Sequence, residues 1–275
     1  MLSLKQHFDV FVFDAFGVLN VGETAIIGAS ECISQLKADN KQVFVLTNGA
    51  SASLAAMPQK YSTLGFDFAP EEVVSSRLAA ELAMQRISEE AGGNLLWGVI
   101  TGGRSSPEDL PVNAVTLDDN QADYDRVDAI AMLSSLTWND ARQKRLRTSL
   151  QSRPRPLVVG NPDVVAPHES GFSLEPGFFA HQLIDEINVS VEFHGKPFQS
   201  VFELVRQRID EKMKFVVPDK RIAMLGDTLH TDVLGAKAAG WSSILVSDHG
   251  LFRGCNVDDY INESGIVPDW IIPSI

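Results

Sequence analysis

Short, fully apolar runs alternate with segments of helical periodicity at the start of this 275-residue chain, and no other feature constrains its fold as strongly. The run VFVF at 10–13 is followed by apolar residues at the helical spacing i, i+3, i+4 and i+7 from Ala29 to Leu36. The run VFVLTNG at 43–49 then supplies a second strand that is fully apolar, as buried parallel strands are. The beginning of the chain therefore predicts a βαβ unit.

The same pattern returns near the carboxyl terminus. Apolar runs lie at 215–217, in IAMLGD at 222–227 and in SSILVSD at 242–248. A helical pattern from Val233 to Lys237 separates the last two runs. We therefore predict parallel α/β architecture at both ends of the chain.

The middle of the chain differs, because its apolar runs are separated by polar stretches such as DDNQADYDR at 118–126. The apolar runs are LLWGVITGG at 95–103, DAIAMLSSL at 128–136 and RPLVVGNPD at 155–163. We interpret them as strands of a second, smaller α/β module that is inserted into the first. The predicted main domain comprises residues 1–88 and 189–275, and the predicted inserted domain comprises residues 89–188.

Composition and charge limit the classes of function. A hydrophobic content of 44% is enough to bury a sizeable core. The formal net charge of −13 argues against a nucleic-acid-binding surface, which needs clustered Lys and Arg. Cys32 and Cys255 have no metal-binding spacing and fit a reducing compartment. No apolar run approaches ~18 residues and MLSLKQHFDV lacks a signal-peptide core, so we expect a cytoplasmic protein without a membrane span.

Polar side chains gather where the predicted parallel strands end, and open parallel sheets bind their ligands at that edge. They are Asp14 after the first strand, Thr47 and Asn48 after the second, Asp227 after IAMLG, Asp232 five residues further on, and Lys196 in the turn HGKPF. Three carboxylates suit Mg²⁺, which prefers oxygen ligands. A hydroxyl, an amide and an ammonium suit a phosphate group. Together these residues indicate a site for a metal and a phosphate.

Each of these residues also has an ordinary structural explanation. An Asp at a strand end is more often a helix cap or a turn former than a nucleophile, and a Lys is usually a solvated charge. The segment Thr47–Gly49 could be no more than a tight turn. The glycine-rich segment TGGRSS at 101–106 lacks the Lys-Ser/Thr of a P-loop, so we predict a surface turn there. Only the convergence of several residue types favours chemistry.

Four motifs in a fixed order give the chain a resemblance to the haloacid dehalogenase superfamily. It resembles the class IIA branch, which includes p-nitrophenylphosphatases, nucleotide-monophosphate phosphatases and pyridoxal-phosphate phosphatases. The motifs are FVFDAFGVLN at 11–20, VLTNGAS at 45–51, HGKP at 194–197 and GDTLHTDVLGAKAAGW at 226–241. GNPDVVAP at 160–167 resembles the signature of the inserted domain of that branch, which is called the cap. The resemblance implies a Rossmann-like parallel-sheet core, an inserted α/β cap, and a phosphatase acting on a small phosphorylated metabolite.

The resemblance also implies roles for individual residues. Asp14 would be the nucleophile that takes the phosphoryl group. Thr47 and Lys196 would neutralise the phosphoryl oxygens, and Lys196 would also keep Asp14 ionised. Main-chain N–H groups at Asn48 and Gly49 would hold phosphate too. Many relatives have a second Asn where this chain has Gly49, so one side-chain contact is missing.

The resemblance implies Mg²⁺ as the cofactor. Asp14, the main-chain carbonyl of Phe16 and Asp227 would hold the ion, and Asp232 would bind or orient a ligand water. A carbonyl ligand does not depend on the side chain, so Phe16 can still supply it. Capped relatives often pair through the cap, which leaves a homodimer as an open expectation. The identity of the substrate stays open as well.

Phe16 is the main departure from the family pattern. The family's phosphatases have a second Asp at this position, which protonates the leaving oxygen and then deprotonates the water that cleaves the aspartyl phosphate. Phenylalanine can do neither, and the loss of general acid–base help typically costs ~10²–10⁴-fold in rate. We therefore expect binding to persist while the turnover of poor leaving groups falls.

Three interpretations follow from this departure. The first is a Mg²⁺-dependent phosphatase that is restricted to activated leaving groups or that uses another acid. The candidates for that acid by residue type are His168, His181, His194 and His230. The second is a phosphoryl-ligand binder or regulator without turnover. The third is a carbon–halogen hydrolase, because DAFGVL resembles the first motif of the dehalogenases, which have an aromatic residue here. The pair Asp227 and Asp232 favours the metal-dependent branch, so the dehalogenase ranks last.

Overall fold

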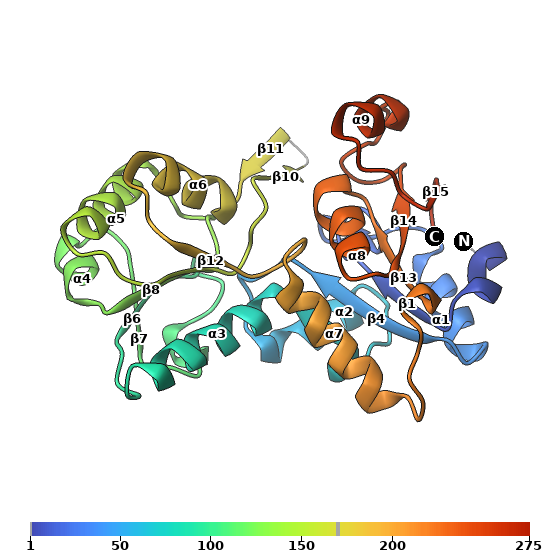
Figure 1. Ribbon diagram of the computed structural model, residues 1–275, viewed down its shortest axis with the longest axis horizontal. Helices are drawn as coiled ribbons and strands as arrows, with labels where there is room; N and C mark the ends of the chain where they lie inside the picture. The colour runs from blue at the N-terminus through green and yellow to red at the C-terminus, as the bar shows by residue number, and fades with distance from the viewer. Residues whose placement is uncertain (1, 169–170) are drawn as a thin grey trace. The chain divides into compact units, whose positions relative to one another are not determined.

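The computed structural model describes residues 2–168 and 171–275 (Figure 1). Contacts divide the chain into two compact units. The first unit comprises Met1–Thr47, Met57–Val74 and Lys196–Ile275, and the second unit comprises Asn48–Ala56 and Ser75–Gly195. Each unit is built around a parallel sheet of its own, which confirms the predicted α/β class.

The first unit contains a six-stranded sheet in the order β15–β14–β13–β1–β4–β5. Its strands are β1 (Val10–Phe13), β4 (Gln42–Thr47), β5 (Val73–Ser75), β13 (Ile222–Gly226), β14 (Ser242–Val246) and β15 (Trp270–Ile272). β1 pairs in parallel with β13 and with β4, so that Phe13 lies opposite Leu225 on one side and Val45 on the other. The carboxyl end of β1 is therefore flanked by the carboxyl ends of two other buried strands.

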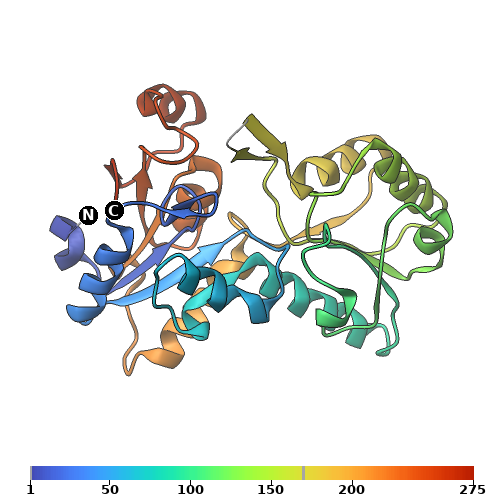
Figure 2. The ribbon, with the colours of Figure 1, turned by 180° about the vertical axis from the view of Figure 1, so that it is seen from behind.

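Helices lie on both faces of this sheet (Figures 1 and 2). The helices and minor elements are η1 (Leu2–His7), β2 (Asn20–Val21), β3 (Thr24–Ala25), α1 (Ala29–Ala38), α2 (Met57–Thr63), η3 (Pro70–Glu72), α7 (Gln199–Lys212), η5 (Asp219–Arg221), η6 (Leu229–Val233), α8 (Leu234–Ala238) and α9 (Val257–Ser264). α1 buries the apolar positions from Ala29 to Leu36 that its periodicity predicts, in one cluster with Phe13. Lys212 of α7 lies over the ring of Phe44, and side chains alternate along a strand, so α7 covers the opposite face.

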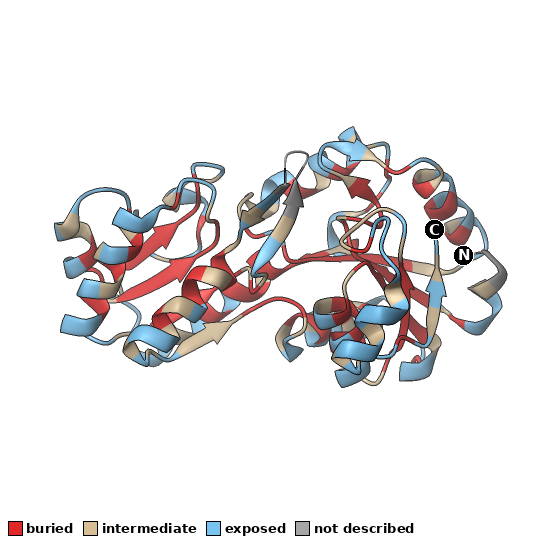
Figure 3. Cartoon of the chain, turned by 90° about the horizontal axis from the view of Figure 1, so that it is seen from above, coloured by how far each residue is buried: buried red, intermediate tan, exposed pale blue. Residues whose placement is uncertain are grey.

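The second unit contains a five-stranded parallel sheet in the order β12–β9–β8–β6–β7, and an antiparallel hairpin of β10 and β11. The strands are β6 (Trp97–Ile100), β7 (Ala114–Thr116), β8 (Ala129–Met132), β9 (Leu157–Val159), β10 (Val165–His168), β11 (Gly171–Leu174) and β12 (Val191–Phe193). The helices are η2 (Leu54–Ala56), α3 (Ser76–Glu90), η4 (Pro107–Asp109), α4 (Gln121–Arg126), α5 (Asp140–Ser152) and α6 (Pro176–Ile187). β6, β8 and β9 confirm the three strands predicted for the middle of the chain, and they are buried (Figure 3).

One predicted strand is wrong. The apolar run at 215–217 forms no strand, and Phe215 and Val216 are exposed. Pro218 follows directly and has no N–H group to donate to a neighbouring strand, which disfavours pairing there. The polar stretch at 118–126 also contains more structure than a linker, because α4 forms within it and buries Tyr124.

The limits of the two units differ from the predicted domain limits at 88/89 and 188/189. α3 and β12 fall in the second unit. β12 pairs with β9, and Ala80 and Met84 of α3 join the apolar cluster around Trp97. An amphipathic pattern shows that a helix covers a sheet, but it does not show which sheet. The division of the chain into separately folding domains stays a prediction.

Two further sequence features have structural counterparts. Both cysteines are free, Cys32 in the interior and Cys255 at the surface. In the part of the chain that the structure describes, no helix is both long enough and apolar enough to cross a membrane.

Candidate active site

The predicted catalytic residues of the first unit lie at one edge of its sheet. Asp14 follows β1 directly, Asp227 follows β13, and Thr47 is the last residue of β4. These three strands are parallel neighbours, so their carboxyl ends meet at the same edge. The order of the strands is therefore what brings together residues that are far apart in the sequence.

Three carboxylates converge at this edge. Asp14, Asp227 and Asp232 each offer an oxygen atom, and these atoms lie within 4.8 Å of one another. The ammonium of Lys196 lies 2.5 Å from Asp14 Oδ1 and 2.7 Å from Asp232 Oδ1. All four side chains are buried. One ammonium cannot balance three carboxylates, so the cluster has an excess of negative charge when it is fully ionised.

The excess charge and the burial shift the acid–base equilibria of the cluster. Burial raises the pKa of Asp14 to about 7, against the opposing effect of the Lys196 charge. Burial raises the pKa of Asp227 to about 6, and the Asp232 charge adds to this shift. Burial alone would lower the pKa of Lys196, but the charges of Asp14 and Asp232 outweigh it and raise that pKa above its ordinary value. The ammonium therefore stays charged while the carboxylates compete for protons.

Asp227 is held by contacts that leave no room for other side chains. Its Oδ2 accepts a hydrogen bond from the main-chain N–H of Leu251 at 2.9 Å, and its Oδ1 accepts one from the hydroxyl of Thr228 at 3.0 Å. A Cβ atom on Gly17 would lie 2.6 Å from Asp227 Oδ2, and Gly17 has a φ of +73°. Glycine at position 17 therefore has two physical causes, the backbone conformation and the close approach of a carboxylate.

Asp232 is fixed by a short irregular helix. It lies in η6, a single π-helical turn that follows β13, and π turns often occur at functional sites. Its Oδ1 accepts from Lys196, and its Oδ2 accepts from the main-chain N–H of Thr228 at 3.1 Å. The turn directs Asp232 back towards the end of the strand, so that the five-residue spacing from Asp227 places both acids in one cluster.

Phe16 is half-buried, two residues beyond Asp14. The main chain at this point is fixed, because the N–H of Gly17 donates to the carbonyl of Asn20 at 2.8 Å and the N–H of Asn20 donates to the carbonyl of Ala15 at 3.0 Å. Among the described residues, no main-chain N–H donates to the carbonyl of Phe16. The role of the Phe16 carbonyl as a metal ligand stays a prediction.

Two family models match the parts of the chain that contain this cluster. A family model described as haloacid dehalogenase-like hydrolase matches residues 11–102, and a second one, described as HAD-hydrolase-like, matches residues 193–275. The two matched segments contain all four carboxylate and ammonium residues of the cluster. The chain belongs to the haloacid dehalogenase-like superfamily.

Relatives within this superfamily extend along the whole chain. A glycerol-3-phosphate phosphatase from Gallus gallus is 28% identical over 99% of this chain and 91% of its own length. A crystal structure described as a possible sugar phosphatase of the HAD superfamily, from Cytophaga hutchinsonii, has a TM-score of 0.84 at 24% identity and covers 99% of this chain and 96% of its own. A glycerol phosphate phosphatase from Mycobacterium tuberculosis, solved in complex with magnesium, has a TM-score of 0.72 at 22% identity and covers 98% of this chain and 76% of its own.

Two residues of the predicted phosphate site of this haloacid dehalogenase-like protein lie in the second unit. Thr47 ends the first segment of the first unit, and Asn48 and Gly49 begin the second unit. The side-chain amide of Asn48 donates to Asp163 Oδ1 at 2.9 Å, within the Asn-Pro-Asp segment. The structure therefore places this amide on a protein carboxylate, and the roles of Asn48 and Gly49 towards phosphate stay predictions.

The histidines that sequence analysis offered as alternative acids have other surroundings. His194 is buried in the second unit against Glu192, with 3.0 Å between Nε2 and Oε1, and burial lowers its pKa. His181 stacks on Phe193 with 5.2 Å between ring centroids. His230 is exposed. The side chain of His168 lies outside the described residues.

Tyr61 is a neighbour of the site that sequence analysis missed. This α2 residue is fully buried, and its hydroxyl forms no well-directed hydrogen bond within the described residues. Burial raises its pKa, the charge of Asp14 adds to the shift, and the nearby Thr47 side chain opposes it. An aromatic residue on the apolar face of a helix is indistinguishable from an ordinary core residue in the sequence, so no signal could have indicated it.

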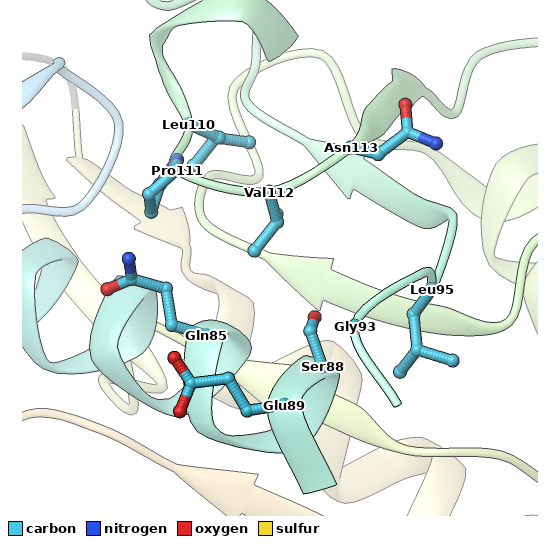
Figure 4. A pocket seen from close by; sticks show the side chains of 9 residues that line it. All are labelled: Gln85, Ser88, Glu89, Gly93, Leu95, Leu110, Pro111, Val112 and Asn113. Carbon is cyan, nitrogen blue, oxygen red and sulfur yellow. The ribbon is translucent and has the colours of Figure 1, made fainter. Parts of the chain in front are cut away.

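The second unit contains a pocket of its own, of about 510 Å³ (Figure 4). One wall is α3, with Gln85, Ser88 and Glu89, and the other includes Leu110 and Val112. The hydroxyl of Ser88 is already engaged, because it donates to the Met84 carbonyl and accepts from the indole N–H of Trp97. None of the clustered carboxylates lines this pocket, so it is not part of the acid site.

Proposed function

We propose that this protein is a Mg²⁺-dependent phosphatase that hydrolyses a small phosphorylated metabolite through an aspartyl phosphate on Asp14. The carboxylate–ammonium cluster carries the proposal, because it puts an ionisable nucleophile 2.5 Å from a buried cation. The names of the relatives support the reaction class. A relative that matches almost the whole chain is named glycerol-3-phosphate phosphatase. Small phosphate esters are therefore the first substrates to test.

The chain's own residues suit a divalent cation. Three carboxylate oxygens within 4.8 Å of one another match the hard oxygen ligands of Mg²⁺, and the excess negative charge of the ionised cluster attracts a cation. Asp14, the Phe16 carbonyl and Asp227 would hold the ion, with Asp232 at a ligand water. When bound, the ion supplies Lewis-acid stabilisation of the phosphoryl oxygens. The magnesium complex of the mycobacterial relative supports this choice of ion.

In the first chemical step, an ionised Asp14 oxygen forms a bond to phosphorus while the bond between phosphorus and the leaving oxygen breaks. Lys196 holds the nucleophile in place and favours its ionised form, because it donates to the same cluster of oxygens. Water then attacks the phosphorus of the aspartyl phosphate, which releases inorganic phosphate and restores Asp14. The first step needs a proton on a poor leaving oxygen, and the second step needs a base for the attacking water. The side chain of Phe16 can supply neither.

A second candidate function rests on Phe16 alone. The nucleophile, the carboxylates and the ammonium are all present, whereas the acid–base group is absent. A protein with that combination can bind a phosphoryl ligand and turn it over slowly or not at all. The regulator and the phosphatase therefore share one site and differ only in rate.

One assay separates these candidates. Wild type and Asp14→Asn are compared with Mg²⁺ on acetyl phosphate, p-nitrophenyl phosphate and glycerol 3-phosphate, beside a panel of haloacids. A restricted phosphatase hydrolyses the first two much faster than the third, and Asp14→Asn removes the activity. Vanadate binding without hydrolysis of any ester would identify the regulator, and halide release would identify the dehalogenase.

Two expectations about the whole protein belong to the same proposal. The two free cysteines support a reducing, cytoplasmic compartment. The exposed apolar residues Val165 and Phe172 on β10 and β11 support a homodimer that forms through the second unit. Light scattering on wild type and Phe172→Lys tests the pairing, and equal masses for the two would contradict this surface.

A further inference from the structure

Tyr61 carries a hydroxyl group that the packing of the core does not require. This residue of α2 is fully buried, in the apolar cluster that also contains Phe13, Val45 and Phe68. Its ring meets the ring of Phe68 edge to face, with 5.7 Å between the centroids. A phenylalanine at position 61 would make the same apolar contacts. The hydroxyl therefore requires an explanation of its own.

This hydroxyl is buried without a well-formed hydrogen bond. Within the described residues it has no partner of good geometry. Burial raises the pKa of Tyr61, so the proton stays on the oxygen and the group remains a donor. Buried polar atoms without partners are rare in folded proteins, and a role at a functional site is one of the few reasons for which they persist.

The side chain of Thr47 lies beside this hydroxyl. Side chains alternate along a strand, so Thr47 at the end of β4 projects from the same face as Val45, which packs in the cluster of Tyr61. Against the effect of burial, hydrogen bonding from the Thr47 side chain lowers the pKa of Tyr61. The two hydroxyls are thus neighbours, although their orientation is not that of a well-formed hydrogen bond.

The hydroxyl of Tyr61 is also close enough to the acid cluster to be affected by its charges. Besides burial, the charge of Asp14 raises the pKa of Tyr61, and the charge of Lys196 lowers it. All four residues, Tyr61, Thr47, Asp14 and Lys196, belong to the first unit. Thr47 is a predicted ligand of the phosphoryl oxygens. One side chain therefore separates the hydroxyl of Tyr61 from the predicted phosphate site.

The chemistry of a threonine hydroxyl gives this arrangement a use. The group has one proton to donate and two lone pairs that accept. It can bind a phosphoryl oxygen only as a donor, so its proton must not be directed at another oxygen. A tyrosine that donates to Thr47 Oγ1 occupies a lone pair and leaves the threonine proton for the phosphate. Hydrogen bonds in such a chain polarise and strengthen one another.

We propose that Tyr61 is a positioning residue for phosphate binding: its hydroxyl donates to Thr47 Oγ1 while Thr47 donates to a bound phosphoryl group. The proposal rests on the proposed phosphatase function. In the ligand-free protein the tyrosine hydroxyl is poorly paired, and a small rotation of the Thr47 side chain towards the ligand completes the chain. The proposal explains why a tyrosine stands where phenylalanine would make the ligand-free protein more stable.

The test measures vanadate affinity of the full-length protein by isothermal titration with Mg²⁺ present. Tyr61→Phe should bind vanadate about three- to tenfold more weakly than wild type, which is the range that one neutral hydrogen bond supports. Its melting temperature without ligand should not fall below that of wild type, so weaker binding would not reflect a damaged fold. The matched control is Tyr124→Phe in the second unit, which removes a hydroxyl bonded to the Asp118 carbonyl and should leave vanadate affinity unchanged.

A double-mutant cycle tests whether Tyr61 acts through Thr47. Thr47→Val removes the threonine hydroxyl and keeps the branched side chain. Adding Tyr61→Phe to Thr47→Val should cause no further loss of vanadate affinity, because the tyrosine then has no hydroxyl to orient. In a Thr47→Ser background, which keeps the hydroxyl, Tyr61→Phe should still weaken binding.

Two results would overturn the proposal. One is a vanadate affinity of Tyr61→Phe equal to that of wild type. The other is an equal loss with and without the Thr47 hydroxyl, because Tyr61 would then act by another route. In both cases wild type still binds vanadate, and the proposed phosphatase function stands. If wild type binds no vanadate, the proposed function fails and the role of Tyr61 fails with it.

Discussion

At the scale of single residues, the proposed function makes Phe16 the residue that limits which phosphate esters this site hydrolyses. An alkoxide needs a proton as it leaves, whereas an acyl or nitrophenyl group departs as a stable anion. We expect Phe16→Asp to raise the turnover of glycerol 3-phosphate by at most ~10²–10⁴-fold and to help acetyl phosphate much less. Steady-state rates on both substrates measure the difference.

The control for this prediction is a second substitution, at the proposed nucleophile Asp14. Asp14→Asn in the Phe16→Asp background must abolish the gain, because the attack on phosphorus comes first. A gain of equal size on every substrate would place the effect in the hydrolysis of the aspartyl phosphate, which all substrates share, and would contradict a role at the leaving oxygen. No gain on any substrate while vanadate still binds would contradict it too, and would favour the regulator.

The hydroxyl of Tyr61 is a single buried group whose removal should stabilise the protein. Within the described residues it has no partner of good geometry, although the Thr47 side chain lies beside it. A buried unsatisfied polar group costs about 1–3 kcal/mol. Tyr61→Phe should therefore raise the melting temperature by several degrees, since about 1 kcal/mol corresponds to roughly 2–4 °C in a chain of this size. Thermal unfolding is the measurement.

Tyr124→Phe is the matched control for Tyr61→Phe. The hydroxyl of Tyr124 is engaged, because it donates to the carbonyl of Asp118 at 2.7 Å. Its loss should lower the melting temperature. If both variants melt below wild type, Tyr61 has a hydrogen-bond partner after all, and the Thr47 hydroxyl beside it is the first candidate.

At the scale of elements, much of the fold could be predicted because β1, β4, β13 and β14 are short, apolar and separated by helical spacing. The positions of Asp14 and Asp227 could be predicted from the same pattern, because each residue directly follows such a strand. The sheet that α3 covers could not be predicted, because an amphipathic pattern is the same over either sheet. The complete burial of Arg77 in the first turn of α3 could not be predicted either, since a charged residue in a helix is usually at the surface.

The end of β13 together with η6 should be the element on which metal binding depends most. Asp227→Ala removes a proposed metal ligand, and loss of even an outer partner of a metal site typically costs ~10–100-fold in metal affinity. We expect Mg²⁺ binding to weaken by at least that much in isothermal titration. Gly17→Ala should act in the same direction, because its Cβ would displace Asp227 Oδ2.

Asp248→Ala is the control for Asp227→Ala. Asp248 lies just beyond the end of β14, in the same sheet, but it is exposed and is not a member of the carboxylate cluster. The Asp248→Ala variant should bind Mg²⁺ with the same affinity as wild type. Equal Mg²⁺ affinity of Asp227→Ala and wild type would contradict the proposed metal site.

At the scale of the whole molecule, the cluster should make the stability of the metal-free protein fall as the pH rises. Burial raises the pKa of Asp14 from 3.8 to about 7 and that of Asp227 from 3.8 to about 6. Between these values and the unfolded value, the folded state binds more protons than the unfolded state. Stability then decreases with increasing pH, and the contribution of these groups is lost as the pH rises through the folded pKa values. Lys196 stays charged throughout this window and does not change the sign.

The measurement is the free energy of unfolding in EDTA at several pH values between about 4 and 8, for wild type and Asp14→Asn. Asparagine cannot ionise, so the variant should lose much of the decline and should exceed wild type in stability at the upper end. Mg²⁺ binds the ionised carboxylates of the folded state, so adding it at pH 8 should restore stability to wild type by mass action. It should restore less to Asp14→Asn, which lacks one ligand. A metal-free wild type whose stability rises steadily from pH 4 to 8 in parallel with the variant would show that the clustered acids ionise at ordinary pH. The excess negative charge would then not be what draws a cation to the site.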